Sequence, residues 1–395
     1  MTTFELSIAA LRARRNSKWN RYGGDVIPAW VAEMDFSVAA PIQRAVGRIY
    51  EQMDYGYPLR DGARADLAVS NAFAARMKER FGWEVDPELV LPVADLVQGT
   101  FAPIHAFSEP GEGVLLQVPA YPPFREAILD NGRRLIEVPM VDDGARHQLD
   151  LALLERRIDP TTRILVLCNP QNPTGRVFGR DELLEVGRLA IERDLIVISD
   201  EIHSDLVFDG RRHIPIASLS PEIAARTVTI TSPTKSFNIP GLRCAVLHFG
   251  TAALRDRFFG RFPRRMAGQP NIIGIDATVA AWTQGQPWLD EVLAHLGRMR
   301  DHVARRLRAE LPEIRFHLPE ATYMLWLDCS GLGFNVTAAE FFLQNAKVAF
   351  SPGETFDPAS PQFIRFNFAT SAAIVDEILD RMVGAVKHAR SGVRS

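Results

Sequence analysis

The pattern of apolar and polar positions divides this chain of 395 residues into parts. From about residue 89, short apolar runs alternate with stretches of helical spacing. Each run is leucine-rich or β-branched and apolar on both faces, which is typical of strands buried between two layers of helices. The expected strands are Gly113–Tyr121, Arg134–Val141, Arg163–Asn169, Leu195–Asp200, Thr227–Thr231 and Arg243–Phe249.

A helical segment between two of these runs indicates the topology of the middle of the chain. Asp181–Asp194 has helical spacing and connects two expected strands, which makes a strand–helix–strand unit. Such units build a parallel sheet with helices on both faces. We therefore expect a large three-layer α/β/α domain with a mostly parallel sheet over residues 50–286.

The pattern changes near residue 286, where a long amphipathic helix is expected. A smaller α+β portion follows, with strand patterns at Tyr323–Asp328 and Phe363–Asn367 and a closing helix near Ala373–His388. The helical spacing is carried by Leu289, Val292, Leu293, Leu296, Met299, Val303 and Leu307.

The first fifty residues show no regular pattern, and we expect them to be irregular. We assign residues 1–49 and 287–395 together to a small α+β domain. The chain thus has two expected domains, as its length allows.

Composition narrows the class of protein. With 45 basic and 48 acidic residues, the net charge is −3, so nothing favours binding to nucleic acid or to an anionic membrane. No apolar run reaches the ~18 residues of a membrane span, and the first twenty residues lack the features of a signal peptide. We expect a cytoplasmic protein. Its three cysteines have no regular spacing and indicate neither a disulfide framework nor a metal cluster.

Chemically useful side chains follow four of the expected strands. In an open α/β sheet, ligands bind beyond the carboxyl ends of the strands. Taken singly, Asp200 could cap a helix, Lys235 could be a solvated loop charge and Asn172 a turn residue. Their joint placement predicts a binding site at one edge of the sheet. The four segments are Pro-Ala-Tyr-Pro-Pro (119–123), Asn-Pro-Gln-Asn-Pro-Thr-Gly (169–175), Asp-Glu-Ile-His (200–203) and Ser-Pro-Thr-Lys-Ser-Phe (232–237).

These segments, with two others, resemble the fold-type I pyridoxal-phosphate (PLP) enzymes of the class I/II aminotransferase group. The other two are Gly-Leu-Arg (241–243) and Ile-Arg-Phe-Asn-Phe (364–368). Within that group the chain is similar to the MalY/PatB-like cystathionine β-lyase (C–S lyase) branch. The branch similarity rests on His203 and on Ala-Trp-Val-Ala-Glu-Met-Asp-Phe (29–36), Tyr-Gly-Tyr-Pro (55–58), Pro-Ala-Tyr-Pro-Pro-Phe (119–124) and Thr-Tyr-Met-Leu-Trp-Leu-Asp (322–328).

The resemblance implies a catalytic set around the cofactor ring. Lys235 would hold PLP as a Schiff base and then act as the base that takes the Cα proton. Asp200 would pair with the pyridine nitrogen, so that the ring acts as an electron sink. Asn172 would bind the ring 3′-oxygen, and Tyr121 would stack on the ring unless it only packs. His203 would support the ring or Asp200, the alternative being a core histidine.

The resemblance also implies a phosphate site and a substrate site. Ser232 and Arg243 occupy phosphate-binding positions, and Tyr57 matches a tyrosine that reaches the phosphate of a neighbouring subunit, which implies a homodimer. Arg365 would bind the α-carboxylate of the amino-acid substrate through a bidentate pair, rather than forming a surface salt bridge. Trp30 and Tyr323 would suit an apolar thioether pocket.

One departure concerns the turn that usually cradles the phosphate. The family has a glycine- or serine-containing turn there, whereas this chain has Asp95, whose carboxylate would repel a phosphate. We expect Asp95 to be a helix N-cap, so that the amides of Leu96 and Val97 still meet the phosphate. The alternative is weaker cofactor binding or a divergent function.

The motifs around the ring leave three reactions open after removal of the Cα proton: transamination, racemisation and β-elimination. The branch resemblance implies β-elimination of a thiol from cystathionine or another S-substituted L-cysteine, giving pyruvate and ammonia. The alternatives are an aminotransferase of unassigned substrate and a regulatory protein-binding role.

Overall fold

The computed structural model describes residues 4–60 and 62–392, and the chain divides into two compact units. The larger unit comprises Val38–Gln171 and Arg176–Asp290. The smaller unit comprises Met1–Ser37, Asn172–Gly175 and Glu291–Ser395. The second boundary falls inside one long helix, α12 (Gln286–Glu310).

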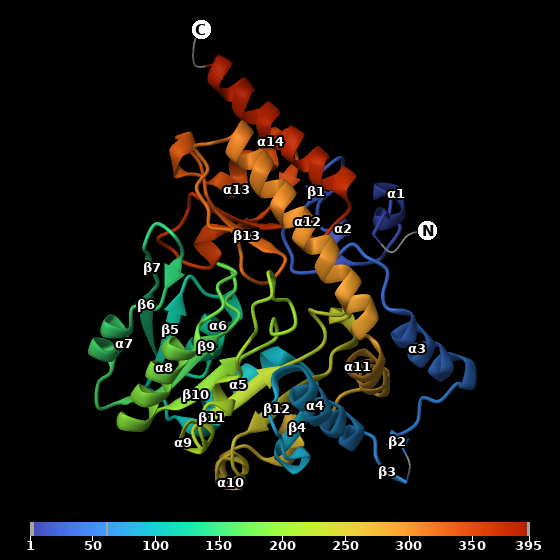
Figure 1. The fold of residues 1–395 in the computed structure, drawn as a ribbon, viewed down its shortest axis with the longest axis vertical. Helices are drawn as coiled ribbons and strands as arrows, with labels where there is room; N and C mark the ends of the chain where they lie inside the picture. Colours follow the sequence, from blue (N-terminus) through green and yellow to red (C-terminus); the bar gives the residue numbers. More distant parts are fainter. Residues whose placement is uncertain (1–3, 61, 393–395) are drawn as a thin grey trace. The chain divides into compact units, whose positions relative to one another are not determined.

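A seven-stranded sheet forms the centre of the larger unit (Figure 1). Its strand order is β4-β12-β11-β10-β9-β5-β6, and β12 alone runs against its neighbours, so the sheet is mostly parallel as expected. All six expected strands are confirmed, and β4 is an addition. The bounds are β4 Val90–Val93, β5 Gly113–Val118, β6 Arg134–Pro139, β9 Thr162–Cys168, β10 Ile196–Asp200, β11 Thr227–Thr231 and β12 Ala245–Phe249.

Helices cover both faces of this sheet. Side chains alternate along a strand, so Val114 and Leu116 of β5 face one helix layer while Leu115 faces the other. The first layer contains α5, α6 and α10, and the second contains α7 and α8 (Figure 1). The three-layer α/β/α architecture is confirmed. The helix bounds are α5 Leu96–Phe107, α6 Pro122–Asp130, α7 Leu151–Arg157, α8 Arg180–Glu192, α9 Pro221–Ala224 and α10 Ala252–Arg261.

Strand β5 ends earlier than its apolar run indicated. Pro119 has no amide hydrogen to give to a ladder, and the strand stops at Val118. Tyr121 instead precedes α6 as its N-cap residue, and prolines occupy the first helical positions. This change of direction brings Tyr121 to the carboxyl edge of the sheet.

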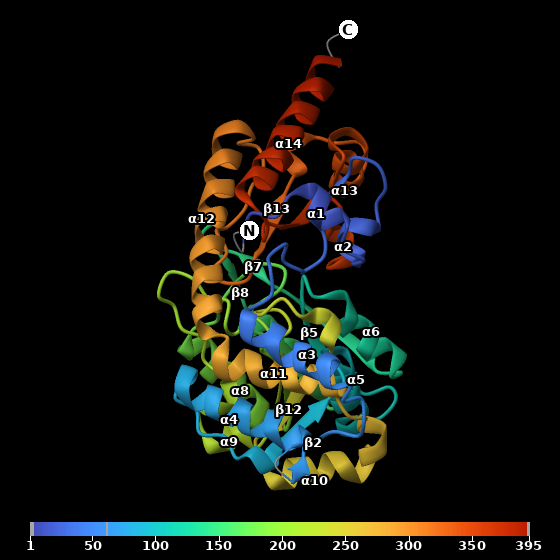
Figure 2. The same cartoon turned by 90° about the vertical axis from the view of Figure 1, so that its right-hand side faces the viewer.

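The expectation that the first fifty residues are irregular is wrong for three segments of the described part. They contain α1 (Ile8–Arg12), α2 (Ser17–Asn20) and most of α3 (Ala40–Gln52). Pro41 is tolerated in the first turn of α3. Helix α3 packs along α11 (Ile272–Gln284), beside α4 (Asp66–Phe81) (Figure 2).

The smaller unit is built on the three-stranded antiparallel sheet β13-β16-β15. The long helix after residue 286 and the closing helix are both confirmed, as α12 and as α14 (Ala372–Gly392). The other elements are β1 Ile27–Pro28, β13 Met324–Asp328, α13 Ala338–Phe341, β14 Val348–Ala349, β15 Ser351–Pro352 and β16 Phe363–Asn367. Among the helices of residues 4–60 and 62–392, none combines the length and apolar character that crossing a bilayer requires.

Candidate active site

Asp200 and Lys235 belong to neighbouring segments at the carboxyl edge of the large sheet. Asp200 is the last residue of β10 and pairs in register with Ile230 of β11. Strand β11 ends one residue later, and the chain then turns through Ser232 to Lys235. Because β10 and β11 are parallel, both segments emerge at the same edge. The charge of Lys235 acts directly on the Asp200 carboxylate.

The environment of Asp200 favours a cationic partner. The pKa of Asp200 is raised to about 7, mainly by burial and to a smaller extent by the negative charge of Glu201. The amide of Ile202, which donates to Oδ1 at 3.0 Å, and the charge of Lys235 oppose this rise. A buried carboxyl group of this kind stays ionised when a cation pairs with it. The protonated nitrogen of a pyridine ring is such a cation, so the residues present fit PLP.

Glu201 has its own buried partners. Its Oε1 accepts hydrogen bonds from Ser199 Oγ (2.8 Å) and from the amide of Ile216 (3.3 Å), and its Oε2 lies 2.8 Å from His213 Nε2. These contacts hold the strand end that carries Asp200. The sequence motif contained Glu201, but two of its partners, His213 and Ile216, lie in a different segment and were not predicted.

Ser232 and Arg243 lie on the segments flanking Lys235. Ser232 Oγ donates to the carbonyl of Cys244 at 2.6 Å and lies 3.0 Å from Thr234 Oγ1, which ties the two segments together. Arg243 has a left-handed backbone, with φ 46°. A positive φ is uncommon for a residue with a side chain, and strained backbone of this kind tends to cluster at functional sites.

The expected capping role of Asp95 is confirmed. Its Oδ1 accepts the amide of Gln98 at 2.9 Å, which begins α5. Asp95 caps only the amide of Gln98, so the amides of Leu96 and Val97 can donate to another acceptor. They lie at the positive end of the helix dipole. Asp95 Oδ2 lies 2.8 Å from Arg243 Nη1. The carboxylate is thus neutralised by the cation that we expected to bind the phosphate.

The other expected residues of the larger unit differ in exposure. Tyr121 is half-buried, and its ring packs edge-on against Phe124 at a centroid distance of 5.8 Å. His203 is buried three residues after Asp200. Tyr57 is fully exposed, in the segment between α3 and β2 (Leu59–Arg60).

The smaller unit brings together Arg365, Asn172 and Trp30. Arg365 lies on β16 and is buried. Its Nη1 donates to Asn172 Oδ1 at 2.9 Å, and its Nη2 donates to the carbonyl of Trp30 at 3.0 Å and to Ser351 Oγ at 3.1 Å. The guanidinium also packs over the ring of Phe356, at 4.7 Å. Arg365 is therefore a rigidly held buried cation and does not form a surface salt bridge.

Trp30 and Tyr323 have different surroundings within this unit. The Trp30 indole Nε1 donates to the carbonyl of Lys18 at 3.3 Å, and Arg21 packs over the ring. Tyr323 is fully buried, and burial raises the pKa of its hydroxyl, while the charge of Arg365 opposes the rise. Tyr323 therefore lies close enough to Arg365 for the guanidinium charge to act on its hydroxyl group.

Two groups that support these residues were not predicted from the sequence. Ser351 accepts a hydrogen bond from Arg365. Ser351 begins β15, which is only two residues long, and so short a strand has no recognisable sequence pattern. In the larger unit, Arg76 of α4 pairs with Asp205, five residues after Asp200. A signal for Arg76 did exist, because it falls on the apolar helical face that includes Val69 and Phe73.

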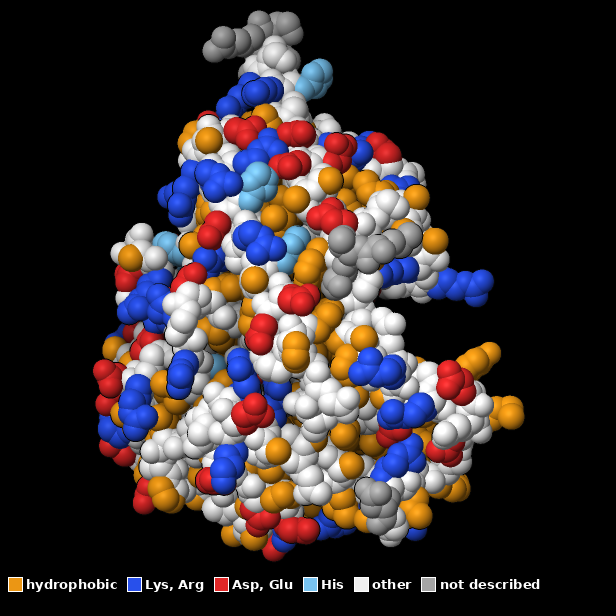
Figure 3. Space-filling model, turned by 45° about the vertical axis from the view of Figure 1, so that its right-hand side comes forward, with side chains coloured by type: hydrophobic (Ala, Val, Ile, Leu, Met, Phe, Trp, Pro, Cys, Tyr) orange, Lys and Arg blue, Asp and Glu red, His pale blue; other side chains and the backbone are white. Residues whose placement is uncertain are grey.

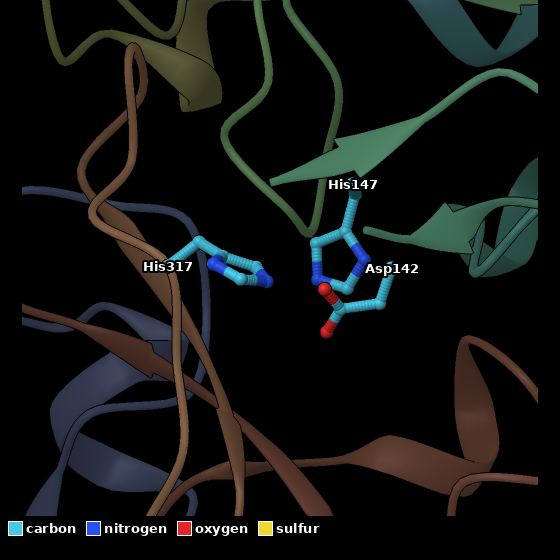
Figure 4. A group of neighbouring side chains, drawn as sticks. All are labelled: Asp142, His147 and His317. Atoms are coloured by element: carbon cyan, nitrogen blue, oxygen red, sulfur yellow. The ribbon is translucent and has the colours of Figure 1, made fainter. Parts of the chain in front are cut away.

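A hairpin of the larger unit juxtaposes two metal-ligand types. Asp142 of β7 (Val141–Asp142) pairs in register with His147 of β8 (His147–Gln148). Figure 4 shows the two side chains. Within the described part of this unit, no third His, Cys, Asp or Glu joins them at ligand distance.

Comparison with known proteins gives the class of this one. The family model for aminotransferase class I and II matches residues 62–382, and the chain belongs to that family. It is 34% identical to cystathionine beta-lyase PatB of Bacillus subtilis (strain 168) over 376 residues, which cover 93% of this chain and 96% of PatB.

Two solved structures share the fold over nearly the whole chain. The crystal structure of OvoB is 35% identical with a TM-score of 0.91 and covers 98% of this chain and 99% of its own. Cystalysin from Treponema denticola, whose crystal structure contains a pyridoxal 5′-phosphate cofactor, is 28% identical with a TM-score of 0.88 and covers 95% and 96%. The fold is that of the PLP-dependent fold-type I enzymes.

Proposed function

We propose that this chain is a PLP-dependent C–S β-lyase. It converts cystathionine or another S-substituted L-cysteine, with water, into pyruvate, ammonia and a thiol. The observation that carries the proposal is the buried Asp200 carboxyl group beside Lys235 at the carboxyl edge of the sheet. The similarity to PatB over nearly the full length supports the choice of β-elimination.

PLP, when bound, supplies an electron sink for the electron pair that remains at Cα after its proton is removed. Asp200 would keep the pyridine nitrogen protonated, because its buried carboxylate gains from a cationic partner. Lys235 would hold the cofactor through its side-chain amine, and the same amine, once free, would take the proton from Cα. The electron pair of the broken Cβ–S bond would leave with the sulfur as a thiolate.

The phosphate is bound by donors that the larger unit gathers near α5 and after β11. Ser232 supplies a hydroxyl, Arg243 a positive charge, and Leu96 and Val97 their backbone amides at a helix N-terminus. Tyr121 packs against the ring. These roles, with His203 beside the ring or Asp200, are supported by the positions of the residues along the sheet edge.

The smaller unit supplies the substrate contacts. Arg365 binds the α-carboxylate, and its contacts with Ser351 and the Trp30 carbonyl hold the guanidinium in one plane. Asn172, which accepts from Arg365, binds the 3′-oxygen of the ring. Trp30 and Tyr323 belong to the thioether pocket. Trp30→Ala should change turnover or the choice among thioether substrates, and no change in either would contradict this part.

The active form is a cytoplasmic homodimer in which Tyr57 reaches the phosphate of the partner subunit. The full exposure of Tyr57 supports this proposal, because a fully exposed aromatic side chain suits an interface. No disulfide joins the three buried cysteines Cys168, Cys244 and Cys329, which suits a reducing compartment.

The experiment incubates the purified protein and PLP with L-cystathionine, without a keto-acid acceptor, and follows pyruvate and free thiol. Steady release of both in equal amounts supports the β-lyase. The family description favours aminotransfer as the second candidate. A single stoichiometric change of the cofactor spectrum, with no release of pyruvate, would contradict the lyase and favour an aminotransferase.

A control variant tests the residue assignment. Lys235→Ala should abolish both turnover and the covalent capture of PLP by borohydride, because no other amine is placed to attach the cofactor in this proposal. Capture that persists in Lys235→Ala would overturn the assignment of Lys235.

A further inference from the structure

Arg76 and Asp205 form a buried ion pair in the larger unit. Their side chains are 2% and 6% exposed. Arg76 Nη2 donates to Asp205 Oδ1 at 2.7 Å, and Arg76 Nε donates to Oδ2 at 3.2 Å. This is a bidentate fork, which fixes both planes relative to one another.

The remaining contacts of Arg76 reach three further parts of the unit. Its Nη2 donates to Gln286 Oε1 at 3.1 Å, and its Nη1 donates to the carbonyl of Trp282 at 3.4 Å. Its guanidinium lies over the ring of Phe237, at 5.4 Å. Phe237 comes two residues after Lys235, so Arg76 of α4 packs directly on the segment that carries this lysine.

Asp205 connects the same segment to the end of β10. It follows Asp200 by five residues in the turn after that strand. Its Oδ2 accepts a hydrogen bond from Ser236 Oγ at 3.4 Å. Ser236 is the neighbour of Lys235. The ion pair is therefore bonded to both segments, the one that carries Asp200 and the one that carries Lys235.

A buried ion pair is weak evidence for stability, because desolvation of the two charges offsets their attraction. Its best-attested effect is to specify one arrangement of the elements that it joins. Here the joined elements carry the two groups that, in the proposed function, bind opposite ends of one rigid ring.

We propose that Arg76 and Asp205 are positioning residues that set the separation between the Lys235 amine and the Asp200 carboxylate. The inference rests on the assignment of those two residues in the proposed function. The contacts of Arg76 and Asp205 described above are all with other protein groups. The two residues act by holding the Lys235 segment in register with the end of β10. A displacement of ~1 Å at such a site costs on the order of 10²-fold in turnover.

The test uses the double variant Arg76→Met/Asp205→Leu. It replaces both charges by apolar side chains, which buried sites of this kind tolerate because no unpaired charge remains. We expect it to fold, as judged by its melting temperature. We expect its Kd for PLP to rise about tenfold or more, the midpoint of the pH titration of its visible absorbance to shift, and kcat to fall on the order of 10²-fold with little change in KM.

A buried arginine elsewhere in the unit gives the matched control. Arg133 is buried at the start of β6, the opposite end of the parallel strands, where it donates to Ser108 Oγ at 2.9 Å. Arg133→Met should lower the melting temperature yet leave the Kd for PLP and the absorbance midpoint unchanged.

A folded double variant with the wild-type PLP Kd, absorbance midpoint and kcat overturns the proposal. If the double variant does not fold, Arg76→Lys decides. Lysine keeps the charge but loses the fork, so a smaller shift of the midpoint in the same direction is expected, and an unshifted midpoint overturns the proposal. The Lys235→Ala result separates this failure from failure of the proposed function, because it tests the attachment residue alone.

Discussion

Burial is the main cause of the pKa shifts of three ionisable side chains along the large sheet. Burial raises the pKa of the Cys244 thiol to about 11, with a hydrogen bond to Thr278 opposing the rise, so Cys244 stays a protonated core residue. Burial lowers the pKa of His248 to about 4, while the charge of Asp86 opposes this. At Asp200 burial raises the pKa to about 7, next to Lys235. Burial thus makes Cys244 unreactive, whereas it makes Asp200 suited to pair with a cationic ring.

The two carboxylate oxygens of Asp95 have separate partners, the amide of Gln98 and the side chain of Arg243, so their contributions can be tested separately. Asp95→Ala removes the cap of α5 and should cost about 1 kcal/mol of unfolding free energy. Asp95→Ser keeps a capping oxygen and should cost less, although both variants lose the pair with Arg243. Urea unfolding measures the cost. Equal destabilisation by the two variants would contradict the capping role.

The same position tests whether the carboxylate opposes the phosphate. Because Arg243 neutralises Asp95, we expect no large gain in PLP affinity in Asp95→Gly, measured by titration of the apoprotein. A large gain would mean that the carboxylate repels the phosphate in spite of the pair.

The lowered pKa of His248 predicts that the free energy of unfolding decreases in acid. Its ring is buried on β12 against Trp83, at a centroid distance of 4.8 Å. The folded protein binds the proton only near pH 4, whereas the unfolded chain binds it near pH 6.5. Between these values the unfolded state holds more protons, so the stabilisation is complete above pH 6.5 and is lost as the pH falls toward 4. The loss is on the order of 3 kcal/mol.

Unfolding by urea at a series of pH values measures this loss. The matched variant is His248→Phe, which keeps an aromatic ring but cannot bind a proton. It should show a flatter dependence on pH between 6.5 and 4. Identical slopes for the two proteins would exclude His248 as the group responsible.

At the level of elements, the N-terminus of α11 docks on the backbone that carries Arg243. Asn271 caps this helix by accepting the amide of Gly274 at 2.8 Å, and its Nδ2 donates to the carbonyl of Leu242 at 3.0 Å. A Cβ atom at Gly274 would lie 2.4 Å from the Leu242 oxygen and 2.9 Å from the Arg243 oxygen. The helix therefore approaches Arg243 only because residue 274 is glycine.

Gly274→Ala should push the Arg243 segment away from α11. We expect weaker PLP binding, by about tenfold if the phosphate loses one charged contact worth about 1.5 kcal/mol. The control is Gly260→Ala in α10, where a Cβ meets open space and should stabilise the helix slightly. Titration of each apoprotein with PLP decides. Equal affinities in the two variants would contradict the role of the close approach.

At the level of the whole molecule, apolar side chains gather in one exposed segment of the larger unit. They project from residues 50–59 and are 60 to 102% exposed: Tyr50, Met53, Tyr55, Tyr57 and Leu59. Hydrophobic side chains project in this way at the right of Figure 3. Such a cluster on a protein surface marks an interface, here the proposed contact with a second copy.

Met53→Glu and Leu59→Glu should shift the protein from dimer to monomer in sedimentation experiments, because each buries a charge in the proposed interface. The same variants should lose PLP affinity, since Tyr57 would no longer reach the partner. Ile191→Glu, on the exposed side of α8, is the control and should change neither property. Wild-type protein that sediments as a monomer, with full activity, would contradict the dimer.

Local sequence determined much of this protein. Strands buried on both faces have continuous apolar runs, so the six expected strands, the helices α8, α12 and α14 and the cap at Asp95 all followed from patterns within a few residues. The order of the strands then put Tyr121, Asp200 and Lys235 at one edge, because parallel strands end on the same side.

The tertiary structure alone decided which distant side chains meet. Arg76 and Asp205 are 129 residues apart, and Arg243 and Asp95 are 148 apart, yet each pair is in direct contact. Arg365 takes its partners from residues 30, 172 and 351. No periodicity records such partners, because long-range pairs are chosen by the packing of whole elements and by the need to compensate each buried charge.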